Sequence, residues 1–484
     1  MSYGRTKIYT NTEVITAANV VKELQDAYAV HQTNRQEIQT LWDYYRGKTK
    51  ILDKVKEVRE NINHKINENR AYQIVSFHKG YTFGEPIQYI RRENTKGENT
   101  ADDDLASEIN ALNGYMADAD KAACDNELAE WLYVSGTSYR FVLSNKKYGQ
   151  DDEPPFNVYS LDPRNTFVVY HAGASKKPIM GVTYYEKTDG SLLFSVYTEA
   201  AFYEIKGDAV PGQKIAGQSH ALGMIPIIEY PANNPRLGVF EVVMPLLDAL
   251  DELQSNRLDD VVQFVNSFLA ILGAEVSEEV RKKLDEWKML QLPEGADAKY
   301  LAGTLNQAEV QTLKADLLQA ILEVCGVPNR NGGSSTSDTG SAVIMRDGWE
   351  SAEAHAKSVE EIFKKSEKQT LRLVLRILRD KVGTKLKLSD IVTHFTRRNY
   401  ENIASKSQVL IAMLNNSKIH PELAFAHCGM FADPESAYLQ SRAWWEEQQK
   451  QEEKEAEEYV KSLNEEHDHD DTVQDSGQSD IVSE

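Results

Sequence analysis

A stripe of apolar residues at helical spacing runs through residues 240–272 and is followed by a second such segment, Gln307–Val324. The first stripe is made by Leu246, Leu250, Leu253, Val261, Val265, Leu269 and Leu272, and Gly273 ends it. A stripe of this kind predicts a helix that must cover one face against another element. The pattern therefore predicts two long helices that are separated by a short mixed insert, residues 274–305.

A Gly- and Ser-rich segment, Asn329–Gly340, follows the second helix and predicts a flexible loop. Asp338 or Thr339 then caps a predicted helix that reaches Val382. About 45 residues of helix would span roughly 65 Å. Gly348 falls inside this stretch and predicts a kink there.

The first 85 residues have helical periodicity, with predicted helices from Asn11 or Thr12, over 34–45 and over Arg70–Tyr81. Arg91–Ser107 is polar and predicts an exposed loop. A helix near 118–132 is followed by segments rich in β-branched and aromatic residues, which predict an α+β region over 108–235. The predicted strands are 138–144, 156–161, 166–171, 180–187 and 192–206, with a hairpin turn at Thr188-Asp189-Gly190.

The C-terminal part predicts a strand at 386–395, helices to about residue 449 and then a disordered tail. Residues 441–484 carry fifteen Asp/Glu and four Lys/Arg, so about half of the chain's net charge of −21 lies there. Such a segment has too few apolar residues to bury. Trp444 and Trp445 precede the tail, and the commoner use of aromatic side chains favours their packing on the body over docking of a partner.

No motif for catalysis, a cofactor or a metal site is visible. Gly-Lys-Thr at 47–49 lacks the earlier glycine of a P-loop, because that position is Trp42. The spacing of the histidines is not that of a metal site. Glu465–Asp471 could bind a divalent metal only weakly, because nothing in the sequence fixes the geometry of these side chains. Three widely spaced cysteines fit a reducing compartment. No run of 18 apolar residues and no secretory signal is present, so no membrane association is expected.

The second half of the long predicted helix is basic. Rows of cations such as these can contact phosphates, but they are more often solvated faces that pair with neighbouring carboxylates, here Glu360, Glu361 and Glu367. The solvated face is the favoured interpretation. The basic residues are Lys357, Lys364, Lys365, Lys368, Arg372, Arg376, Arg379 and Lys381.

Several short segments, taken in order over about 30–445, resemble the siphophage-type portal proteins of tailed bacteriophages. They are Tyr44–Gly47, Asn61–Asn69, Lys79–Pro86, Tyr133–Tyr139, Leu161–Arg164, Gly223–Tyr230, Gln254–Asp260, Gly340–Ala342 and Phe431–Ser436. Each is a weak motif, and the resemblance is carried by their order and spacing.

The resemblance implies a predominantly helical α+β portal fold, assembled as a closed ring, typically of twelve subunits. It divides the chain into a wing with N-terminal helices (1–235), a first stem helix (236–273), a clip (274–305), a second stem helix (306–326), a tunnel loop with a long wing helix (327–383), a crown (384–450) and a disordered acidic tail (451–484).

The implied function is a DNA channel at one capsid vertex for genome packaging, head–tail joining and ejection, without intrinsic catalysis and without a cofactor. The implied DNA-channel residues of the tunnel loop are Asn329, Arg330, Asn331, Gly332, Gly333, Ser334, Ser335, Thr336, Ser337 and Asp338. The implied partner-binding residues of the clip are Glu286, Trp287, Lys288, Glu294, Lys299 and Tyr300.

The implied partners are other copies of the chain, double-stranded DNA, the terminase large subunit, a head–tail connector, and the capsid and scaffolding proteins. The implied location is the virion, after assembly in the host cytoplasm. Two alternatives remain open on the sequence: a metal-dependent DNA-processing enzyme that uses scattered carboxylates, and a helical adaptor with no role at DNA.

Overall fold

The computed structural model describes residues 4–57, 60–92, 102–150, 153–265, 268–272, 297–301, 307–329, 348–396, 403–431 and 434–474. The chain forms two compact units, residues 1–398 and 399–484. Each unit is described by itself below. The mixture of helices and sheets agrees with the predicted α+β class.

The first sheet of the larger unit has six strands in the order β1-β5-β6-β7-β8-β9. Their bounds are Ile8–Thr10, Thr166–His171, Pro178–Glu186, Leu192–Tyr197, Ala201–Lys206 and Gln218–Ser219. Neighbours pair antiparallel except β1 and β5, where Ile8 lies opposite Val169 in a parallel pair. The strands predicted over 166–171 and 180–187 are confirmed, but the single strand predicted over 192–206 is divided into β7 and β8, which pair with each other antiparallel. Gly190 takes the left-handed conformation (φ 80°) in the turn between β6 and β7.

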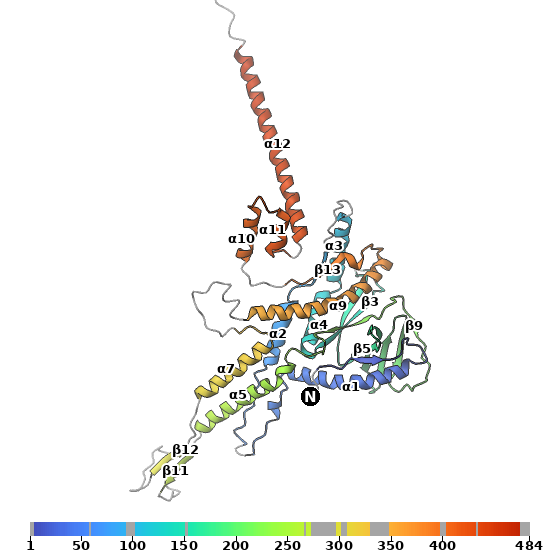
Figure 1. The fold of residues 1–484 in the computed structure, drawn as a ribbon, viewed down its shortest axis with the longest axis vertical. Coiled ribbons are helices and arrows are strands. Elements are labelled where there is room, and N and C mark those ends of the chain that lie inside the picture. Colours follow the sequence, from blue (N-terminus) through green and yellow to red (C-terminus); the bar gives the residue numbers. More distant parts are fainter. Residues whose placement is uncertain are drawn as a thin grey trace, which may run out of the picture. The chain divides into compact units, whose positions relative to one another are not determined.

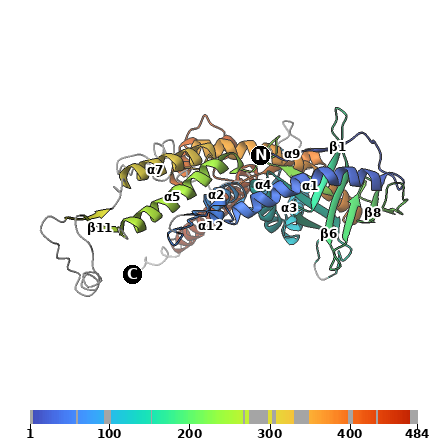
Figure 2. The same ribbon diagram turned by 90° about the horizontal axis from the view of Figure 1, so that it is seen from below.

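Helix α1 (Val20–Tyr45) covers one face of this sheet, as Figures 1 and 2 show. Its residues Val20, Val21 and Leu24 pack in one cluster with Phe167 and Val196 of the sheet. The burial of such side chains supplies most of the stability of an amphipathic helix.

The helix predicted over 34–45 is confirmed, but the start at Asn11 or Thr12 and the break before Asn34 are wrong, because strand β1 is followed by one continuous helix, α1. Asn34 was taken as a helix start from its capping propensity. In the structure Asn34 lies in the middle of α1. Its side chain accepts a hydrogen bond from the Thr6 backbone N (2.9 Å) and donates one to the Thr6 carbonyl (2.8 Å). A long-range contact thus uses the polar group that suggested a cap.

A second core lies between a three-stranded sheet and several helices. The sheet has the order β10-β3-β4, with bounds Ile227–Pro231, Thr137–Ser144 and Phe156–Leu161. The helices are α2 (Arg70–Phe83), α3 (Asp102–Asp118), α4 (Lys121–Ser135) and α9 (Trp349–Lys381). A small sheet of β2 (Gln88–Arg91) and β13 (Ile391–His394) adds Tyr89 and Ile391 to this core.

Two expectations for this region are corrected. Part of the exposed loop predicted over 91–107 is helical, because α3 begins at Asp102 and buries Ile109, Leu112 and Met116 on one face. The strand predicted over 386–395 is shorter. A 3-10 turn, η3 (Leu388–Asp390), precedes β13.

A buried network of charged side chains fixes α9 to this core. The Arg140 guanidinium donates to Glu367 (2.8 Å) and also bonds Asp125, while Lys121 Nζ lies 2.5 Å from Asp125 and 3.3 Å from Glu367. The hydroxyls of Tyr89 and Tyr230 donate to the Glu367 carboxylate at 2.5 and 2.7 Å. Two cations and two carboxylates therefore balance each other where water is excluded.

The first predicted long helix, over 240–272, is shorter in the structure, and the second is confirmed as α7 (Gln307–Val324). The first, α5 (Met244–Val265), follows a 3-10 turn, η2 (Glu241–Val243), and gives way to strand β11 (Phe268–Leu272). A run of five apolar residues is compatible with either a helix or a strand, and pairing with β12 (Asp297–Leu301) decides for the strand. Gly348 causes no kink, because it takes φ 83° as the N-cap of α9, and residues 330–347 lie outside the described residues.

The smaller unit contains α10 (Ile403–Leu414), α11 (Pro421–Cys428) and α12 (Pro434–Gln474). The prediction of a disordered tail from 451 is wrong up to Gln474, which ends α12. Residues 451–458 consist mostly of Glu, Lys, Gln and Ala, which are strong helix formers, and they are helical with exposed side chains. Trp444 and Trp445 are 62% and 57% exposed, so these rings are not packed within the smaller unit, and their expected packing on the body stays a prediction.

Candidate DNA and partner contact regions

Helices α5 and α7 (Gln307–Val324) lie side by side, and Figures 1 and 2 show them leading to the β11–β12 pair. Phe268 lies opposite Leu301, and Leu272 lies opposite Asp297. The chain therefore leaves along α5, passes through β11, and returns through β12 and α7. Arg257 of α5 donates to Gln307 (2.7 Å) and Gln311 (2.9 Å) of α7, which links the two helices across their shared side.

The predicted clip residues divide between described and undescribed parts of the chain. Glu286, Trp287, Lys288 and Glu294 lie outside the described residues. Lys299 and Tyr300 lie in β12, opposite Ala270 and Leu269 of β11. The structure thus places two of the six on the strand pair that follows the two helices.

Pro328 and Gly348 lie close together on either side of the segment that contains the predicted tunnel loop, Asn329–Gly340. Gly326 (φ 64°) follows α7, and a Cβ on Gly348 would lie 3.9 Å from the Cα of Pro328. The chain leaves at Asn329 and re-enters at Gly348 beside the same point. Asn329 is half-buried, and the remaining predicted tunnel-loop residues, 330–338, lie outside the described part of the chain.

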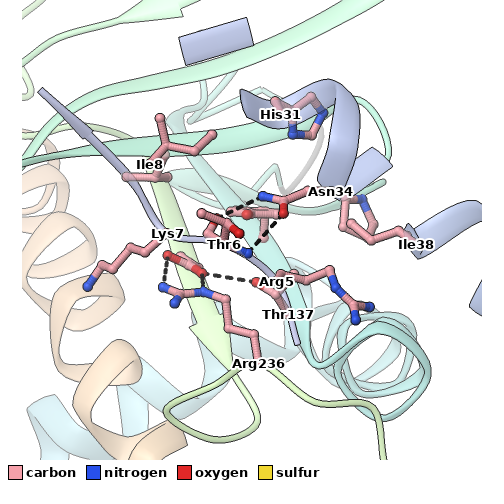
Figure 3. Close-up of a pocket in the computed structure, with 13 residues that line it drawn as sticks. Arg5, Thr6, Lys7, Ile8, His31, Asn34, Ile38, Thr137 and Arg236 are labelled. Atoms are coloured by element: carbon pink, nitrogen blue, oxygen red, sulfur yellow. Dashed lines mark hydrogen bonds and ion pairs between the residues drawn. The ribbon is translucent and has the colours of Figure 1, made fainter. Parts of the chain in front are cut away.

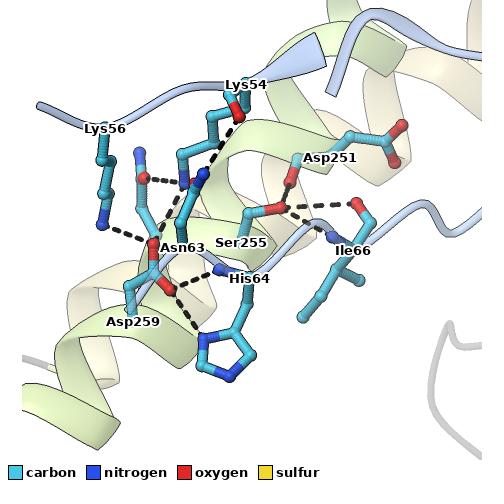
Figure 4. Close-up of polar contacts among 9 residues, drawn as sticks. Lys54, Lys56, Asn63, His64, Ile66, Asp251, Ser255 and Asp259 are labelled. Atoms are coloured by element: carbon cyan, nitrogen blue, oxygen red, sulfur yellow. Dashed lines mark hydrogen bonds and ion pairs between the residues drawn. The ribbon is translucent and has the colours of Figure 1, made fainter. Parts of the chain in front are cut away.

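A segment of the N-terminal region, residues 49–68, lies along α5 and is bound there by polar side chains (Figure 4). We call this segment the α5 strap. Asp251 of α5 accepts hydrogen bonds from Thr49 Oγ1 and the Glu68 backbone N, both at 3.0 Å. One turn further, Ser255 Oγ accepts from the Ile66 backbone N at 2.9 Å.

Asp259 makes the third attachment of the α5 strap, and its side chain is fully buried. It accepts hydrogen bonds from Lys56 (2.5 Å), Lys54 (3.1 Å) and the backbone N of His64 (2.8 Å), and the His64 ring lies at the same distance. Burial alone would raise the pKa of Asp259, but these donors together hold it well below its usual value. Asp251, Ser255 and Asp259 recur every four residues, a spacing that places them on one helix face and that sequence reasoning missed.

The α5 strap also reaches α7. Glu68 at its end accepts from Lys314 of α7 (2.6 Å) and from Gln254 of α5 (2.6 Å). Both helices of the pair are therefore tied to the same N-terminal segment.

The junction where α7 ends and α9 begins contains two buried histidines from different helices. His78 of α2 lies 2.8 Å through Nε2 from the Cys325 carbonyl, and its ring centroid is 4.6 Å from that of His355 in α9. Burial and then the nearby His355 lower the pKa of His78 to about 3, and burial lowers the pKa of His355. Both rings are therefore neutral at neutral pH, where a charge would be costly.

This pair predicts a measurable dependence of stability on pH. The folded-state pKa of His78 lies below the unfolded value of about 6.5, so the unfolded chain binds the extra proton, and stability falls as pH drops below about 6.5. Between pH 7 and pH 5 we expect His78 to account for a loss of about 2 kcal/mol.

Urea unfolding of the wild type and of His78→Gln at both pH values measures this loss. His31, whose pKa burial lowers to about 4, gives the same kind of loss in both proteins, so the difference isolates His78. Equal losses in the two proteins would contradict the assignment.

A pocket between β1, α1 and the turn before η2 is lined mainly by polar groups that pair with each other (Figure 3). Glu229 accepts from Arg236 at 2.5 and 3.1 Å and from Tyr170 at 2.5 Å. Burial alone would raise the pKa of Glu229, but the Arg236 guanidinium and the Tyr170 hydroxyl lower it. The satisfied pairs make this a packing site between elements.

The basic residues of α9 do not form one uniform paired face. Lys364 pairs with Glu360 at 2.6 Å, and Lys357 lies 3.6 Å from Glu353. Glu367, expected among the pairing carboxylates, is instead buried in the network with Arg140. The expected pairing with neighbouring carboxylates thus holds for Lys357 and Lys364, whereas the cations from Lys365 to Arg379 are solvent-exposed without such pairs in the described part of the chain.

The described ranges contain neither a cluster of metal-binding side chains nor a helix that could span a membrane. No group of three or more His, Cys, Asp or Glu side chains in them is arranged to hold a metal ion. In the same ranges, no helix has the length and apolar character needed to cross a bilayer.

The chain that forms the paired helices α5 and α7 and the strand pair β11–β12 also matches a family of phage portal proteins. The model of the family "Phage portal protein, SPP1 Gp6-like" matches residues 24–461. The chain belongs to this SPP1 Gp6-like portal family.

Comparison with solved structures gives a similar chain described as "Neck of empty GTA particle computed with C6 symmetry". It is 12% identical, with a TM-score of 0.42, and the alignment covers 74% of this chain and 90% of that chain. No curated protein sequence gives a significant match.

Proposed function

We propose that the chain is one subunit of a closed ring that forms the DNA channel at one capsid vertex and serves genome packaging, head–tail joining and DNA ejection. The observation that carries this proposal is the portal-family match over 24–461. The excursion through α5, β11, β12 and α7 supports it, because it gives each subunit a protruding arm that can line a channel. The protein itself would be a scaffold without catalysis, and ATP hydrolysis would belong to a terminase.

Within this proposal, α5 and α7 are the stem, and residues 274–305, including β12, are the clip. Residues 329–340 are the tunnel loop that faces DNA. The close approach of Pro328 and Gly348, which flank the segment that contains this loop, supports this, since a loop anchored at one point on a rigid base can reach into a channel without changing its flanks. The wing comprises 1–235 and α9, and the crown comprises 384–450.

The proposed partners are further copies of the chain, double-stranded DNA, the terminase large subunit, a head–tail connector, and the capsid and scaffolding proteins. The proposed location is the portal vertex of the virion, after assembly in the host cytoplasm. Lys299 and Tyr300 support a terminase or connector contact at the clip, because β12 follows the end of the α5–α7 pair that is distant from the core.

The mass of the purified protein in solution tests the ring. Twelve copies of 54.7 kDa give about 660 kDa by light scattering after size exclusion, and negative-stain images of that peak should show a ring with a central hole. A strictly monomeric protein of 54.7 kDa, both alone and after co-expression with its scaffolding protein, would contradict the proposal.

A further inference from the structure

The exposed face of the second half of α9 consists of cations alone. Between Ile362 and Arg379, each fully exposed residue is Lys or Arg. At 100° per residue, these side chains fall within about 80° of the helix circumference and extend over about 21 Å. The residues, here called the α9 cationic face, are Lys365, Lys368, Arg372, Arg376 and Arg379.

The charges of the α9 cationic face are not neutralised within the described part of the chain. None of the five forms an ion pair there, in contrast to Lys357 and Lys364. Arg376 and Arg379 donate to the carbonyls of Leu222 (2.7 Å) and Leu386 (3.0 Å), which hold the side chains in place without removing their charge. The acidic residues beside the face are Glu361 before it and Asp380 after it, and Glu361 is shared with Lys364 (3.5 Å).

Other elements add positive charge at the Lys365 end of the face. Lys7 directly precedes β1, and burial lowers its pKa. Glu229 opposes this effect, and the nearby charges of Arg236, Lys176 and Lys365 lower the pKa further. Lys7 Nζ lies 3.9 Å from the centre of the Tyr170 ring. Figure 3 shows the Lys7 side chain pointing away from Arg236. Lys7 and Lys176, from two other segments, thus add positive charge near Lys365, whereas the charge of Arg236 is balanced by Glu229.

We propose that the α9 cationic face binds the phosphate backbone of double-stranded DNA. A row of five cations about 21 Å long is long enough to contact several phosphates of a duplex, which carries one charge per about 1.7 Å of helix axis. Lys and Arg side chains in a row recognise phosphates without reading bases, so the contact is independent of sequence. The inference rests on the proposed portal function, since that function brings DNA to the protein.

The net charge of the chain, −21, makes this face distinctive. An acidic body repels DNA generally, so attraction is confined to places where unpaired cations gather. A second copy of the chain offers acidic surfaces too, but acidic side chains would have to match five cations in one straight row, whereas a DNA strand presents regularly spaced phosphates of one sign.

The test is binding of a fluorescently labelled 30-bp duplex of mixed sequence to the assembled protein, by anisotropy, at 50–200 mM NaCl. The triple variant K365Q/K368Q/R372Q should bind at least about tenfold more weakly at 50 mM NaCl. The slope of log K against log [NaCl] should fall in magnitude by about 3, because three phosphate contacts are lost.

The matched control is K22Q/K357Q/K364Q, which removes the same charge from cations that already pair with Asp26, Glu353 and Glu360. It should keep both affinity and slope. Unchanged binding by the first variant, equal losses in both variants, or no binding by the wild type at 50 mM NaCl would overturn the inference.

Light scattering of each variant separates this inference from the proposed function. A wild type that forms no ring contradicts the portal proposal, whereas intact rings with unchanged DNA binding contradict only the role of the α9 cationic face. Loss of rings in K365Q/K368Q/R372Q with DNA affinity retained would assign the face to a second copy of the chain and overturn the inference.

Discussion

Replacement of Glu367 by alanine is expected to lower the free energy of unfolding of the larger unit by about 3–5 kcal/mol. The carboxylate accepts hydrogen bonds from Arg140, Tyr89 and Tyr230 and lies 3.3 Å from Lys121. Its removal leaves two buried cations with Asp125 as the remaining carboxylate, and it leaves a cavity. Isolated buried charge is among the costliest defects in a core.

Urea unfolding followed by circular dichroism measures this loss. The matched control is Glu361→Ala, which removes a glutamate from the exposed side of the same helix, where its side chain is 76% exposed, and which should change stability by less than about 0.5 kcal/mol. If Glu367→Ala does not fold, the milder E367Q, R140M and E367Q/R140M set serves instead. The double variant should lose less than the sum of the single losses. A loss below about 1 kcal/mol in Glu367→Ala, or additive single losses, would contradict the assignment.

The second large effect concerns assembly. Leu258, Val261 and Phe264 of α5 and Leu313 of α7 are 36–50% exposed in the single chain, although they lie on the helix pair proposed as the stem. In the proposed ring, neighbouring subunits would cover these side chains. V261D/F264D places two charges in that interface, and burying unpaired charge opposes association strongly.

We therefore expect V261D/F264D to shift from about 660 kDa to the 54.7 kDa of a monomer in light scattering, with an unchanged circular dichroism spectrum. The control Asp260→Ala, an exposed position on the same helix, should keep the ring. A ring that persists in V261D/F264D would exclude this face of α5 as a subunit interface.

Local periodicity predicted much of this fold. The strands at 156–161 and 166–171 and the helix that begins at Arg70 are confirmed, because their alternation or capping reflects the elements that form. The failures have tertiary causes. Asn34 bonds a distant backbone and not a helix end, and Phe268–Leu272 becomes a strand because β12 pairs with it. A local pattern carries no information about either partner.

The sites divide in the same way. Glu367 was expected on the solvated side of α9, yet it shares the face of Phe363, Leu371 and Val374, which sequence spacing alone could have indicated. Its partners come from four other elements, so no local pattern could have named them. Whether the cations of the α9 cationic face form ion pairs likewise depends on which nearby carboxylates are already bound to other cations. Most of the predicted tunnel-loop and clip residues lie outside the described ranges and stay predictions.

The α5 strap has a mechanical consequence. It attaches to α5 at three successive turns and to α7 through Glu68. The helix pair is therefore held along part of its length and not at a single flexible point. A sideways load at the β11–β12 end would be resisted by Thr49, Lys56, His64 and Ile66 in parallel. A force on the β11–β12 end would therefore be transmitted to the N-terminal region through the α5 strap, and the base of the α5–α7 pair would bend little.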